Sequence, residues 1–87
     1  MHEHGLMKGL MRQILATAAK EKAQRVTGVS VRLGALSHMT PGHFGEHFEQ
    51  AAAGTIAHGA ALDIAASEDI HDPNATDVVL TAVEVET

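Results

Sequence analysis

The 87-residue sequence contains no cysteine, tryptophan or tyrosine, and its only phenylalanines are Phe44 and Phe48. The lack of cysteine excludes disulfides, thiolate zinc ligands and thiol chemistry within this chain, and it suits a reducing compartment. Because large side chains are few and many apolar residues are alanine, burial per residue should be modest. We therefore expect marginal stability or support from a partner.

Basic residues are also scarce. Six Lys and Arg stand against eleven Asp and Glu, which gives a formal net charge of −5 with neutral histidines. Nucleic-acid binding requires a broad basic surface, so we expect no nucleic-acid partner. No apolar run approaches membrane-spanning length and the opening residues do not form a signal peptide, so we expect a cytoplasmic protein without membrane association. The length fits a single domain over residues 1–87.

A first helix is predicted near the start of the sequence. Apolar residues recur four apart from Leu6 to Ala18, which gives one apolar face over about residues 4–24. Met7 and Met11 form a neighbouring row at the same spacing. We interpret these two methionines as core residues and not as a soft metal site.

A second helix is predicted in the middle of the sequence. Thr40 is suited to the N-cap and Pro41 to the first helical position, which predicts a helix that continues to Ala53. Phe44 and Phe48 lie four residues apart on this helix. They define the row that should face the core.

Three strands are predicted from the alternation of apolar and polar side chains, over residues 26–34, 60–66 and 78–86. The polar segment 67–77 should join the last two strands as a loop. The order α-β-α-β-β predicts an α+β fold, with two helices packed on one face of a three-stranded mixed sheet. The second and third strands should leave unpaired edges, so both a monomer and a homodimer remain open.

Histidine is the residue type in surplus, with seven copies, and imidazole is the commonest metal ligand. At the opening, the α-amine of Met1 and the amide and imidazole nitrogens of His2 can close fused chelate rings around one ion. The bulky His2 should protect Met1 from removal. Such nitrogen-rich planar sites are typical of Ni(II) or Cu(II), and Glu3 or His4 could supply a further ligand. Because the amine and imidazole must be unprotonated, binding should weaken as the pH falls.

The other histidines give a weaker indication of metal binding. His43 and His47 are four residues apart on the second predicted helix, a spacing that places both on one face and can chelate a metal. Because the phenylalanines define the buried row, we interpret this pair as part of an exposed flank, where imidazoles are usually solvated. The remaining three fall in predicted turns and should be surface residues: His38, His58 and His71. No arrangement of side chains suits catalysis, so we expect no enzyme.

A series of short segments extends over nearly the whole chain. In order, they are Met1-His2-Glu3 before a helix, Arg25-Val26-Thr27, Leu33-Gly34-Ala35-Leu36-Ser37, a helix from Pro41 that contains Phe48-Glu49, Gly54-Thr55, and Val83-Glu84-Val85-Glu86. Together they resemble the HypA/HybF family of hydrogenase nickel-incorporation proteins. The resemblance implies a nickel metallochaperone that binds Ni(II) through Met1, His2 and Glu3. It also implies delivery of nickel, with a GTPase partner, to the large subunit of a [NiFe] hydrogenase; relatives serve urease.

The chain departs from that family in one large respect. Family members carry two Cys-x-x-Cys pairs in a structural zinc module between the second and last strands, whereas this chain has only the cysteine-free loop 67–77 there. We therefore expect no structural zinc. The absence of the zinc module also bears on whether the partners of the family recognise this chain. His4 also differs from the family, and its imidazole could compete with Glu3 as a nickel ligand.

Two other functions are compatible with the sequence. The chain could be a non-catalytic protein-interaction or regulatory module that kept the family fold but lost metal delivery. It could also be a histidine-rich metal buffer with several weak sites. Nickel binding that depends on His2 would distinguish delivery from both alternatives.

Overall fold

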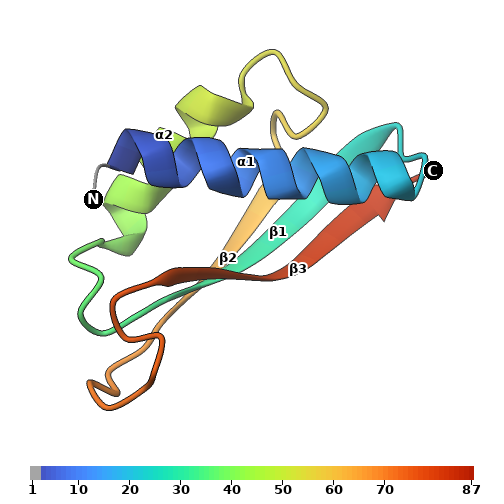
Figure 1. Ribbon diagram of the computed structural model, residues 1–87. Helices are drawn as coiled ribbons and strands as arrows, with labels where there is room; N and C mark the ends of the chain where they lie inside the picture. Colours follow the sequence, from blue (N-terminus) through green and yellow to red (C-terminus); the bar gives the residue numbers. More distant parts are fainter. Residues whose placement is uncertain (1–2) are drawn as a thin grey trace.

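The computed structural model describes the backbone of residues 3–87 and the side chains of residues 5–87. Its elements follow the predicted order: α1 (Glu3–Lys20), β1 (Arg25–Leu33), α2 (Pro41–Ala52), β2 (Ala61–Ala66) and β3 (Val78–Glu86). Figure 1 shows both helices on the same side of the sheet, which confirms the predicted α+β arrangement. Within the described part of the chain, neither helix has the length and apolar character needed to span a membrane.

The sheet has the strand order β2-β1-β3. The central strand, β1, pairs with β2 in parallel and with β3 in antiparallel orientation, so the sheet is mixed as predicted. A register shift between Val26 and Gly28 interrupts the alternation of β1. Because a bulge places an extra residue in one strand, Val26 and Val29 can both face the core. The outer strands, β2 and β3, form the two predicted edges.

Helix α1 is held by an apolar face that packs into the core. Its buried side chains are Met7, Leu10, Met11, Ile14 and Ala18, which confirms both predicted rows. The prediction that this helix reaches residue 24 is wrong. Lys22 adopts a left-handed conformation with φ of 55°, and the amide of Ala23 donates to the carbonyl of Ala18. This is the hydrogen bond of a Schellman ending, here without the usual glycine.

Helix α2 begins as its sequence predicts. The Thr40 hydroxyl accepts a hydrogen bond from the amide of His43 at 3.3 Å, and Pro41 occupies the first turn. Phe44 and Phe48 are 0% and 2% exposed, and their stacked rings lie 6.4 Å apart between centroids. The two rings anchor α2 to the core and fix which of its faces remains outside.

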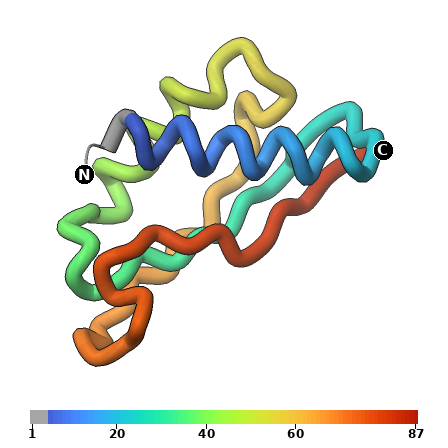
Figure 2. The backbone as a smooth tube through the Cα atoms, in the orientation of Figure 1, coloured from blue at the N-terminus to red at the C-terminus, as the bar shows by residue number. Residues whose placement is uncertain are grey.

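The segment 67–77 between β2 and β3 is an ordered loop. Three of its amides donate to side chains two residues earlier: Asp69 to Ser67 at 3.2 Å, His71 to Asp69 at 2.9 Å and Asn74 to Asp72 at 2.8 Å. The guanidinium of Arg32 on β1 forms an ion pair with Asp72 at 2.5 Å. Figure 2 shows this loop beyond the end of β1. This short polar segment therefore connects β2 to β3 as a loop that its own hydrogen bonds hold in place.

Candidate functional site

The predicted nickel ligands stand at the start of α1. Met1 and His2 lie outside the described residues, and so do the side chains of Glu3 and His4. Glu3 is the first residue of α1. The ligand set itself stays a prediction.

The core positions the beginning of α1 beside α2. Met7 and Met11 are 4% and 7% exposed, so the second and third turns of α1 are fixed by burial. In Figures 1 and 2 the early part of α1 crosses α2, and residues of both helices line a common hollow. Side chains of α2 therefore lie at the end of the molecule where the predicted nickel ligands begin.

The hollow between the helices has a volume of about 450 Å³. It combines an apolar lining with polar and positively charged side chains: Met7, Lys8, Met11, Arg12, Leu15, His47, Gln50 and Ala51. This hollow is not among the features predicted from the sequence. The available signal was the four-residue spacing of Lys8 and Arg12 directly beside that of the two methionines, which places two cations at the border of the apolar face.

His43 and His47 lie on the flank of α2 that adjoins this hollow. Their ring centroids are 4.6 Å apart and the ring planes are inclined by 56°. His43 is exposed as predicted, but His47 is half-buried because it lines the hollow. Among the described residues, no three histidine, aspartate or glutamate side chains come together as a metal site. The pair thus offers two ligands and not a closed site.

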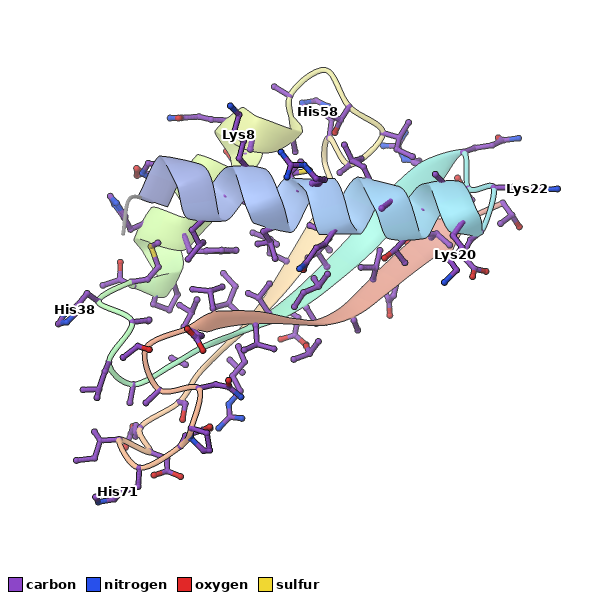
Figure 3. The ribbon with its side chains drawn as sticks, viewed as in Figure 1. Lys8, Lys20, Lys22, His38, His58 and His71 are labelled. Carbon is purple, nitrogen blue, oxygen red and sulfur yellow. The ribbon has the colours of Figure 1, made fainter. Side chains whose placement is uncertain are left out.

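The remaining described histidines are separate from one another. Figure 3 shows His38, His58 and His71 at three different points of the molecule, each in its own connecting segment. All three are exposed, which confirms the prediction that they are surface residues. They serve as natural references for solvated imidazoles in the same chain.

The same arrangement of elements is found in a solved structure of a nickel metallochaperone. The solution structure of the Ni metallochaperone HypA from Helicobacter pylori superposes with a TM-score of 0.79, covering 99% of this chain and 98% of that one, at 19% sequence identity. At that identity the likeness establishes the fold alone.

Sequence comparison establishes the family. The model of the family described as "Hydrogenase/urease nickel incorporation, metallochaperone, hypA" matches residues 1–71. The hydrogenase maturation factor HypA of Bradyrhizobium sp. (strain ORS 278) is 42% identical over 64 residues, and that of Dechloromonas aromatica (strain RCB) is 41% identical over 66. These matches cover 74% and 76% of this chain but only 57% and 58% of the relatives. The chain belongs to the HypA family and spans less than two thirds of these relatives.

Proposed function

We propose that this protein is a non-catalytic nickel carrier that acts in the cytoplasm in the maturation of a nickel enzyme of the [NiFe] hydrogenase type. Membership of the HypA family is the observation that carries the proposal, because the family match includes Met1, His2 and Glu3. The nickel-inserting GTPase and the hydrogenase large subunit are the proposed partners. The loop 67–77 takes the place of the zinc module, so the proposed protein carries no structural zinc.

In this proposal Ni(II) binds the amine of Met1 and the amide and imidazole nitrogens of His2. Glu3 or His4 completes the set. The amide nitrogen of His2 must lose its proton to bind, and a strongly binding late divalent ion promotes that loss. A planar complex of this kind is typical of Ni(II) and leaves its two axial faces open to an incoming ligand.

In this proposal the nickel ligands adjoin the N-terminus of α1, and this position lowers the affinity for Ni(II). The positive end of the helix dipole disfavours a nearby cation by roughly 0.3–1 kcal/mol. That is a factor of about five at most in the binding constant, since about 1.4 kcal/mol corresponds to a factor of ten. The chelate rings therefore determine binding, and the helix favours release. Transfer would proceed by ligand exchange with a docked partner.

The test is a Ni(II) titration of the untagged protein, followed by calorimetry and by absorption in the region of planar Ni(II)–amide complexes. The His2→Ala variant should lose the planar absorption band, because the imidazole that closes the second chelate ring is missing. A variant with one residue added before Met1 should lose it too, since the amine is displaced. The exposed His58→Ala variant is the matched control and should keep it. An unchanged band in His2→Ala would contradict the proposal and favour an interaction module.

A further inference from the structure

The surface of α2 holds one pair of histidines with the spacing of a chelate. The two histidines are the ends of the segment His43-Phe44-Gly45-Glu46-His47, so their imidazoles are separated by one helical turn. Phe44 is fully buried, so the orientation of the helix is fixed and the two rings project together from its flank. Because both ligands belong to one helix, the backbone does not have to move for them to bind the same ion.

The separation of the rings can be compared with that required by a metal. A coordinating imidazole nitrogen lies about 2.1 Å from the ion and about 1.1 Å from its own ring centre, so the centre lies about 3.2 Å from the ion. Two rings in neighbouring positions of a planar or octahedral site, about 90° apart, then have centres about 4.5 Å apart. A tetrahedral angle would require about 5.2 Å. The observed 4.6 Å between the ring centroids of His43 and His47 is a separation that the 90° arrangement allows.

We infer that His43 and His47 form a second binding site for a divalent late transition metal, separate from the terminal ligands. The pair supplies two adjacent ligands, and water or a donor of the recipient protein supplies the others. The exposed carboxylate of Glu46 lies on the same flank and favours a cation. Lys8 and Arg12 line the same hollow as His47, and their positive charges weaken the binding.

The location of the pair suggests its use. His47 lines a hollow together with Met7 and Lys8, which belong to the first two turns of α1. An ion released near the start of α1 would therefore lie at the same end of the molecule as the imidazoles of α2. The choice of Ni(II) as the cargo rests on the proposed function, whereas the chelate itself does not.

The experiment is a Ni(II) titration of the untagged protein and of His43→Ala, His47→Ala and the double variant. Each single variant should lose one of two bound ions, and the double variant should lose no more than either single one, because a chelate requires both rings. The planar absorption band of the terminal site should remain in all three. His58→Ala is the control, since it removes an exposed histidine outside the pair, and circular dichroism should show unchanged helix content throughout.

The outcomes separate the two sites. In His2→Ala, the ion held by the α2 pair should remain and should raise the melting temperature, because a ligand that binds only the folded state stabilises it. Equal stoichiometry in the wild type and in the double variant would overturn the second site and leave the terminal one intact. Loss of the planar band in His2→Ala together with retained binding at α2 would support both sites. A planar band that survives in His2→Ala would contradict only the terminal site.

Discussion

The replacement of Gly34 by alanine tests the closest backbone approach in the fold. Gly34 follows β1, and a Cβ placed on it would lie 2.5 Å from the carbonyl carbon of Ala75 and from the carbonyl oxygen of Asn74, and nearer still to the Ala75 oxygen. Contacts below 3.0 Å are essentially never observed for real Cβ atoms. Because the opposing atoms are backbone, no side-chain rotation can relieve the overlap. The loop must move away from β1.

That movement would strain the hydrogen bonds that join the two segments. The amide of Gly34 donates to Asp77 at 2.9 Å, and the amide of Leu36 donates to Ala75 at 2.7 Å. Overpacking costs typically about 1–3 kcal/mol, and each lost hydrogen bond costs about 0.5–1.5 kcal/mol. We therefore expect Gly34→Ala to lower the free energy of unfolding by about 2–6 kcal/mol, a large part of the roughly 5–15 kcal/mol typical of a folded domain.

The assay is urea unfolding followed by circular dichroism, with Gly45→Ala as the matched control. Gly45 lies within α2, and a Cβ there would meet nothing within 4 Å. Alanine should therefore stabilise the helix at that position, by at most about 1 kcal/mol. If Gly34→Ala unfolds within 1 kcal/mol of the wild type, about the accuracy expected of such measurements, the argument from close backbone contact is refuted.

Three further substitutions test the core, the start of α2 and the loop. Phe44→Ala should cost about 3–5 kcal/mol in urea unfolding, since the ring is fully buried, and a loss below 1 kcal/mol would show a core that collapses around the gap. Thr40→Ala should cost about 0.5–2 kcal/mol in thermal unfolding by removing the acceptor for the His43 amide; no change would show that water caps α2 equally well. Asp72→Asn should cost less than about 1 kcal/mol, because Arg32 is 45% exposed, and a larger loss would show that the ion pair holds the loop.

The sequence predicted the elements and their packing because their signals are local. The apolar row of α1, the Thr40-Pro41 start of α2 and the alternation of the strands each depend on neighbouring residues. The end of α1 was missed because Lys22, with no glycine to mark it, adopts the left-handed conformation. The burial of Val26 was missed because a bulge depends on pairing with β3, a partner about 60 residues away along the chain.

The candidate site was predictable in a different way. The terminal ligands followed from coordination chemistry and the resemblance to a family, not from folding. The half-burial of His47 could not be predicted, because it depends on how α1 crosses α2 and on the hollow that Lys8 and Arg12 line. The 4.6 Å separation of the α2 imidazoles likewise required rotamers that the helical spacing alone does not determine.

The strand order has a consequence for synthesis. The central strand, β1, is made second of the five elements, but one of its neighbours, β3, is made last. Until residues 78–86 leave the ribosome, the amide and carbonyl groups of β1 on that side lack their partners. Until then the nascent chain carries an unpaired strand edge, which is a site for pairing with other chains. Truncation within β3 would make this transient hazard permanent, and the shortened protein should aggregate.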